Sequence, residues 1–301
     1  MIKLFQRIFM KRIISIWMIL TLLMLSGCAA APASSTMDQA TKDEATKDEA
    51  TKDEATADEP ATEAPTLPEP DVKEQAEREY EAILSTPLQG SGQVEVEEMD
   101  QFPELPAGCE SVALTIAINS YGYDLEKTDI ADKYLIYGDS FVDSYVGDPR
   151  VWLDGAGIYP PGIVNTVWNF VEDTGARLYP IDTTSLSLSD LCHFIDAGYP
   201  VVAWETYYDA EPSPDGGYEE RDGIVYQWFR NEHCVTLYGY DLDQGIVMLS
   251  DSVRGKVEIS FSEFEYAYDG IGRFSVVMLD TADYDYPEDF SPDRYTYDGE
   301  E

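Results

Sequence analysis

The spacing of apolar residues changes near residue 198, and this change restricts the fold more than any other feature of the chain. Before it, apolar residues recur at helical spacing in segments 71–85, 109–120, 127–135, 163–175 and 187–198. After it, short β-branched and aromatic runs alternate with turn residues, over 199–206, 224–229, 233–241, 245–251, 256–264 and 273–280. A short alternating run over 92–102 adds one exposed strand. Helices followed by closely spaced strands predict an α+β fold, with N-terminal helices packed on an antiparallel sheet.

The N-terminus has the pattern of a secretion signal. A basic start precedes an apolar run that is too short and wrongly flanked for a spanning helix. The residues that follow, LSGC at 25–28, resemble the bacterial lipoprotein signal, in which the cysteine becomes the lipidated first residue. We therefore expect residues 1–27 to be a lipoprotein signal peptide and Cys28 to carry the lipid anchor. An ordinary signal peptide that happens to contain Cys28 is the alternative.

Residues 28–70 have the composition of a tether. The unit TKDEA occurs three times intact from Thr41 and once in altered form, and no unit contains a large apolar residue. Such a segment cannot offset the entropy of ordering by burying apolar surface. We expect a solvated spacer that holds the folded part away from the membrane. A helix and linker over 71–94 follow it, and an acidic tail over 281–301 ends the chain as a surface extension.

The charge balance excludes several functions. Asp and Glu number 59 against 19 Lys and Arg, for a formal net charge of -40. Such a surface repels nucleic acid, so we expect no nucleic-acid partner. The two histidines and scattered cysteines lack zinc-ligand spacing, and the glycine patterns of phosphate-binding and dinucleotide-binding loops do not occur. We therefore expect neither a metal nor a cofactor.

Cysteine position singles out one candidate nucleophile. With Cys28 lipidated, three cysteines remain, and an odd number outside the cell leaves at least one thiol unpaired. Cys109 follows Gly108 at the start of a helix, where the helix dipole favours the thiolate. Cys192 and Cys234 lie in apolar stretches and are interpreted as core residues, although their spacing also allows a disulfide between them.

A base and an acid can be assigned from strand geometry. His193 lies inside a helical segment and is interpreted as structural. His233 begins one apolar strand and Asp251 ends the next, and a short connection predicts that the two strands form a hairpin. The start of one antiparallel strand and the end of its neighbour share a sheet edge. Asp251 can therefore hold the imidazole of His233 and favour its charged form.

These residues stand in segments that resemble the C39-like cysteine peptidases, relatives of the bacteriocin leader peptidases within the papain-like fold. The resemblance covers residues 95–280 and is carried by LPAGCESVALTIAINSYGY, AGYPVVAWET, EHCVTLYGYD and LSDS. It implies a papain-like α+β fold in which Cys109 is the nucleophile, His233 the general base and then acid, and Asp251 the orienting residue.

Two positions depart from the family pattern. Ser252 follows Asp251 where family members often have proline. Papain-like enzymes also use a glutamine upstream of the cysteine to bind the oxyanion. Gln101 is the candidate for that role, but it precedes Cys109 by eight residues, further than the family spacing.

The sequence therefore predicts a membrane-anchored cysteine peptidase on the extracellular face of a bacterial cytoplasmic membrane. Its triad would be Cys109, His233 and Asp251, and its substrate a peptide or protein. Two alternatives stay open: an inactive binding protein on the same scaffold, and a cell-wall amidase. A depressed thiol pKa at Cys109 would favour an enzyme over the binding protein.

Overall fold

The computed structural model describes residues 71–287 and 289–296. The signal peptide, the lipidation at Cys28 and the tether predicted for residues 1–70 lie outside the described residues. Within this part of the chain, no helix has the length and apolar character needed to cross a membrane.

Six strands form the main path of an antiparallel sheet, in the order β2-β9-β3-β6-β7-β8, and β1 pairs with β6 beside that path. The strands are β1 Ser91–Gln93, β2 Leu178–Asp182, β3 Val201–Thr206, β6 Glu232–Asp241, β7 Ile246–Asp251, β8 Gly255–Ser260 and β9 Ser275–Asp280. A separate hairpin consists of β4 Pro214–Arg221 and β5 Ile224–Phe229. The predicted α+β class with an antiparallel sheet is confirmed.

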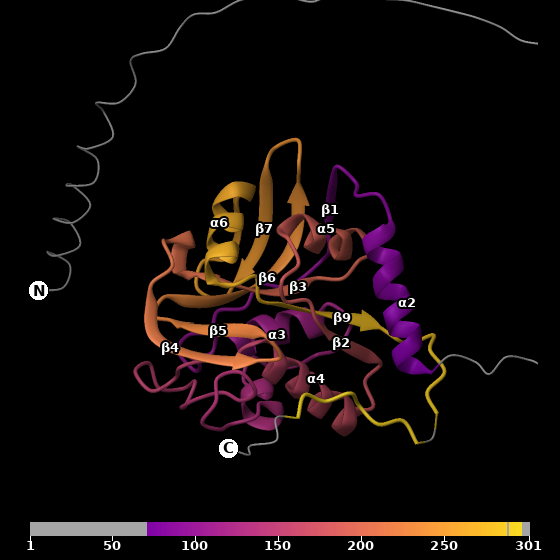
Figure 1. Ribbon diagram of the computed structural model, residues 1–301, viewed down its shortest axis with the longest axis horizontal. Coiled ribbons are helices and arrows are strands. Elements are labelled where there is room, and N and C mark those ends of the chain that lie inside the picture. Colours follow the sequence, from indigo (N-terminus) through magenta and orange to yellow (C-terminus); the bar gives the residue numbers. More distant parts are fainter. Residues whose placement is uncertain (1–70, 288, 297–301) are drawn as a thin grey trace, which may run out of the picture. The chain divides into compact units, whose positions relative to one another are not determined.

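The described part of the chain also contains five helices and two short helical turns. They are α2 Val72–Ser85, α3 Cys109–Asn119, α4 Pro160–Thr174, α5 Leu188–Asp196 and α6 Phe261–Ile271, with a π-helical turn η1 at Ile130–Tyr134 and a 3₁₀ turn η2 at Tyr207–Asp209. Helix α3 lies against β6 and α4 against β2, whereas α6 contacts β3, β7 and β8. In Figure 1, α3 and α4 lie below the central strands and α6 lies above them.

The burial pattern explains why β6 occupies the centre of the sheet. Its residues His233–Tyr240 are all buried, and it pairs with β3, β7 and β1. Helix α3 is buried from Cys109 to Ile118, and most of its residues are apolar or small, so no face of it lies in solvent. A helix that is apolar all round belongs in the interior. Two largely buried elements, α3 and β6, therefore lie against each other, and they carry Cys109 and His233.

Three sequence predictions need correction. Of the strand predicted over 92–102, only the first two residues belong to β1, which ends at Gln93. Beyond Gln93, the one backbone hydrogen bond to β6 among the described residues runs from the Val94 N–H to Tyr238 O. The strand predicted to reach residue 264 ends at Ser260, because Phe264, Ala267, Tyr268 and Ile271 have helical spacing and face the core in α6. Helix α4 starts at Pro160, three residues before its predicted start at residue 163, because proline suits the first turn of a helix. Strands β2 and β4 were not predicted.

The C-terminal segment has no regular structure but is held against α4. Asn165 donates its side-chain amide to Tyr295 O at 2.8 Å and accepts the Tyr295 N–H at 2.9 Å. Arg294 pairs with Glu172 at 2.6 Å. The tail also contacts α2, because Tyr284 donates its hydroxyl to Glu79 and Lys73 pairs with Asp293, so its described residues lie against both helices.

Candidate active site

Cys109 begins α3 in a pocket of about 330 Å³. Packing favours the glycine before it, because a Cβ at Gly108 would lie 3.0 Å from Leu105 Cβ and 3.2 Å from Pro149 Cβ, closer than most side chains tolerate. Cys109 is 8% exposed, and its thiol donates to Glu110 Oε2 at 3.3 Å. Cys109, Cys192 and Cys234 are all free thiols, so the disulfide considered between the last two is not formed.

His233 and Asp251 meet at the sheet edge that the hairpin argument identifies. His233 Nε2 lies 2.9 Å from Asp251 Oδ1, and both side chains are almost completely buried. The same Oδ1 accepts the Val253 N–H at 2.8 Å. His233 Nδ1 is buried and has no hydrogen-bond partner in the described part of the chain. With Nε2 occupied by Asp251, Nδ1 is the ring nitrogen left for proton transfer.

Arg254 joins Asp251 to two further acids. Its guanidinium donates to Asp251 Oδ2, to Asp209 Oδ2 at 2.7 Å and to Glu205 Oε1 at 2.7 Å. Burial alone would raise the pKa of Asp251, but hydrogen bonds from His233 and Arg254 outweigh it and hold that pKa well below its ordinary value. Asp251 is therefore an ionised acceptor for the imidazole near neutral pH.

Gln101 lies in the Cys109 pocket, but its side chain is used locally. Its Nε2 donates to Pro106 O at 2.9 Å, and its Oε1 accepts the Ser252 hydroxyl at 2.6 Å. Ser252, the departure from the family pattern, thus connects the turn after Asp251 to the loop before Cys109. The oxyanion role of Gln101 stays a prediction.

The structure does not join Cys109 directly to His233. No hydrogen bond between these two side chains occurs among the described residues, and His233 does not line the Cys109 pocket. The thiol nevertheless lies against β6, because the backbone N–H of Cys234, the residue after His233, interacts with it and lowers its pKa. Tyr207 links the two regions, since it lines the pocket and its ring centroid lies 4.5 Å from that of His233.

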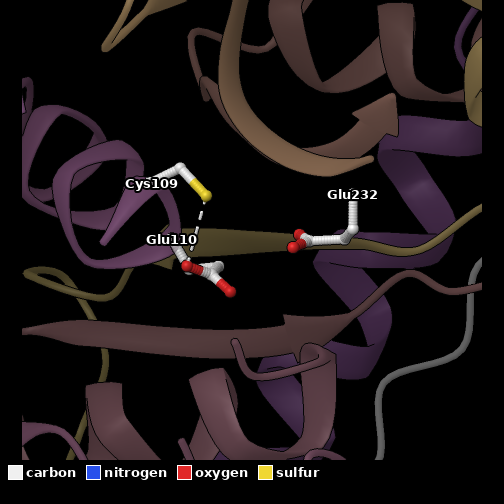
Figure 2. A group of neighbouring side chains, drawn as sticks. All are labelled: Cys109, Glu110 and Glu232. Atoms are coloured by element: carbon white, nitrogen blue, oxygen red, sulfur yellow. Dashed lines mark hydrogen bonds between the residues drawn. The ribbon is translucent and has the colours of Figure 1, made fainter. Parts of the chain in front are cut away.

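Two carboxyl groups next to Cys109 were missed by the sequence reasoning. Glu110 follows Cys109 and Glu232 precedes His233. One side-chain donor or acceptor atom from each of Cys109, Glu110 and Glu232 lies within 4.8 Å of the others. Figure 2 shows Glu232 directed from β6 toward the other two side chains. Strand alternation places Glu232 on the same face of β6 as Cys234, but no sequence signal shows that this face meets the start of α3.

The resting thiol is in an environment that disfavours the thiolate. Burial, followed by the charges of Glu110 and Glu232, raises the pKa of Cys109 well above its ordinary value. This differs from the sequence expectation of a depressed pKa. The expected dipole effect of the α3 N-terminus is outweighed because the thiol is desolvated and faces two acids.

Comparisons with known proteins place this geometry in context. Residues 93–276 match the model of the Peptidase_C39 like family. A crystal structure of a Bacillus anthracis protein described as a C39-like peptidase shares 23% identity, with a TM-score of 0.52, over 64% of this chain and 98% of that one. A digestive procathepsin L 3 from Tenebrio molitor shares 17% identity, with a TM-score of 0.39, over 64% of this chain and 70% of that one. The curated proteins hold no significant match to the chain.

Proposed function

Because this chain belongs to the Peptidase_C39 like family, we propose that it hydrolyses peptide bonds through Cys109, with His233 as general base and Asp251 as its orienting acid. The observation that carries the proposal is the position of the thiol. Cys109 begins a buried helix that packs on β6, and its Sγ lies within 4.8 Å of a carboxylate oxygen of Glu232, the residue before His233. Among the described residues, Nδ1 of His233 has no hydrogen-bond partner.

The proposed reaction starts from a protonated thiol. It requires that the Cys109 side chain rotate so that Sγ leaves Glu110 and approaches Nδ1 of His233, which then takes the thiol proton. The thiolate attacks the substrate carbonyl, and His233 returns the proton to the leaving amine, so that an acyl-enzyme forms at Cys109. Water then attacks the acyl group while His233 takes its proton, the C–S bond breaks to release the carboxylic acid, and His233 returns the proton to the Cys109 sulfur. Catalytic hydrogen bonds often tighten only when substrate is bound.

Incubation of the protein with an unbiased peptide library tests this proposal. We expect new peptide termini to be detected by mass spectrometry with the wild type and not with Cys109→Ser, while Cys192→Ser keeps the cleavage. Cleavage that persists in Cys109→Ser would contradict the proposal.

A binding protein on the same scaffold is the second candidate. Two observations favour it: the thiol hydrogen-bonds to Glu110 rather than to His233, and the Gln101 amide donates to Pro106. Such a protein would retain peptides from the library uncleaved, and Cys109→Ser would bind them as well as the wild type does.

We also propose that the chain acts outside the cell, anchored through Cys28. The support is the sequence LSGC after a basic and apolar segment. Metabolic labelling with a fatty-acid analogue should mark the wild type and not Cys28→Ala. Equal labelling of both would show that Cys28 is not the lipidated residue.

A further inference from the structure

The carboxyl groups of Glu110 and Glu232, beside Cys109, have no lysine or arginine partner in the part of the chain that the structure describes. Glu110 is completely buried, with its Oε1 accepting the Ile158 N–H at 3.0 Å and its Oε2 accepting the Cys109 thiol. Glu232 Oε1 is buried and has no hydrogen-bond partner in the described part of the chain. No ion pair within the described part of the chain joins a lysine or arginine to Glu110 or Glu232. Arg230, which lines the same pocket, pairs with Asp215 instead.

Glu110 is buried and Glu232 is half-buried, and acids removed from water without a cation hold protons more tightly than exposed ones. Burial raises the pKa of Glu110 to about 7. Burial, and then the neighbouring Glu110, raises the pKa of Glu232. A positive charge placed beside them would stabilise their ionised forms and would be stabilised in return. The carboxyl groups of Glu110 and Glu232 are therefore suited to bind a cation.

The pocket leaves room for such a group. A Cβ at Gly157 would lie 2.4 Å from Glu110 Oε1 and 3.4 Å from both Glu232 Oε2 and the Trp228 ring. The lack of a side chain at 157 therefore keeps open the space between the two acids. Trp228, with Trp152 and Tyr207, adds aromatic surface to the same pocket. Aromatic faces combined with carboxylates suit the recognition of a cationic nitrogen.

Building on the peptidase function proposed above, we propose that this site selects substrates with a cationic nitrogen close to the scissile carbonyl, and that Glu232 is the residue that recognises it. Glu110 is fixed by two hydrogen bonds and forms the second wall. Its acceptor atom and that of Glu232 lie within 4.8 Å of Cys109 Sγ. An attacked carbonyl carbon stands about 3–3.5 Å from its nucleophile. Few bonds therefore separate the cation from the carbonyl.

Two sources can supply this nitrogen. The α-ammonium of an N-terminal residue is two bonds from the carbonyl carbon and fits directly. A lysine side chain reaches the same place by folding back. In either case the cation offsets the charges that raise the pKa of Cys109, so the bound substrate itself favours thiolate formation.

Matched chloromethyl ketones separate these sources and test the proposal. Alanyl chloromethyl ketone is compared with its N-acetyl derivative, and N-acetyl-lysyl with N-acetyl-norleucyl chloromethyl ketone. The labelling rate at Cys109 is followed by mass spectrometry in the presence of a chelator. We expect the cationic member of at least one pair to label about tenfold faster or more, a ratio that corresponds to about 1.4 kcal/mol. The pair that shows the preference identifies the source.

Glu232→Gln should bring that ratio close to one within the variant. Glu220→Gln, an exposed acid on β4, is the matched control and should keep it. Equal labelling within both pairs by the wild type, or a preference that survives in Glu232→Gln, would overturn the inference while leaving the peptidase proposal intact. If no probe labels Cys109 faster than free cysteine, the peptidase proposal fails and this inference fails with it.

A metal ion is the competing occupant. The inference would be wrong if Zn²⁺ protects Cys109 from alkylation in the wild type but not in Glu232→Gln, while neither probe pair shows a preference.

Discussion

At the scale of single residues, Arg254 supports the site most directly. It is the cation shared by Asp251, Asp209 and the completely buried Glu205. Removing one partner of a buried ion pair leaves an uncompensated charge, which typically costs about 3–5 kcal/mol. We predict that Arg254→Met lowers the free energy of unfolding by an amount of this order and also lowers peptidase activity, because Asp251 loses a fixed partner.

Urea denaturation monitored by fluorescence measures this change. Arg254→Lys keeps a charge but loses the forked geometry, so its loss of stability should be smaller. Arg273→Met is the control, because Arg273 pairs only with exposed Asp269 in α6. A stability of Arg254→Met within about 0.5 kcal/mol of the wild type would show that the network is not needed.

Glu110 gives a second prediction at this scale. Its pKa is raised to about 7 in the folded protein, against about 4.3 for an unfolded chain. The folded state therefore binds more protons between these values, so this residue's contribution to stability is complete below about pH 4.3 and is lost as pH rises through 7. Relative to Glu110→Gln, wild-type stability should fall by up to about 1.4 kcal/mol per pH unit in this window.

Urea titrations of the wild type and Glu110→Gln at several pH values give this difference in stability. The contributions of the other acids are common to both proteins and cancel in the comparison. A difference that does not change between pH 5 and 7 would contradict the assigned pKa.

At the scale of elements, the site depends on how α3 lies against β6. Thr236 in β6 is buried, and its hydroxyl donates to Ala113 O in α3 at 2.8 Å. Thr236→Val keeps the shape of the side chain but removes this hydrogen bond, which typically contributes about 0.5–1.5 kcal/mol. Because α3 carries Cys109 and β6 carries His233, we predict that kcat falls more than KM rises.

Thr236→Ser retains the hydroxyl and should keep most of the activity. Steady-state kinetics on any peptide that the wild type cleaves would decide the matter. Equal kcat values for Thr236→Val and the wild type would show that this contact does not align the two elements.

At the scale of the whole molecule, local features of the site can be predicted from the sequence. The contacts between segments that are distant in the sequence cannot. The start of α3 at Cys109 and the pairing of β6 with β7 follow from helix spacing and strand alternation, so the contact between His233 and Asp251 could be predicted. The approach of Glu232 to Glu110 depends on how β6 packs against α3, and no local pattern encodes it. The same holds for Arg254, which follows Asp251 in a turn yet reaches Glu205 on β3.

The position of the thiol shows the same limit. A helix N-terminus predicts a favoured thiolate, but burial and two acids brought in by tertiary packing reverse the direction of the pKa shift. The surroundings of Cys109 in the resting pocket therefore favour its protonated form.

The proposed chemistry requires Cys109 and His233 to act together, although no hydrogen bond joins them at rest. The most direct test is the rate at which a peptidyl chloromethyl ketone labels Cys109 in the wild type, in His233→Ala and in His193→Ala. General base catalysis contributes about 10²–10⁴-fold, so His233→Ala should label at least about a hundredfold more slowly, while His193→Ala labels at the wild-type rate. Equal labelling by the wild type and His233→Ala would contradict the claim and favour a binding protein on a peptidase fold.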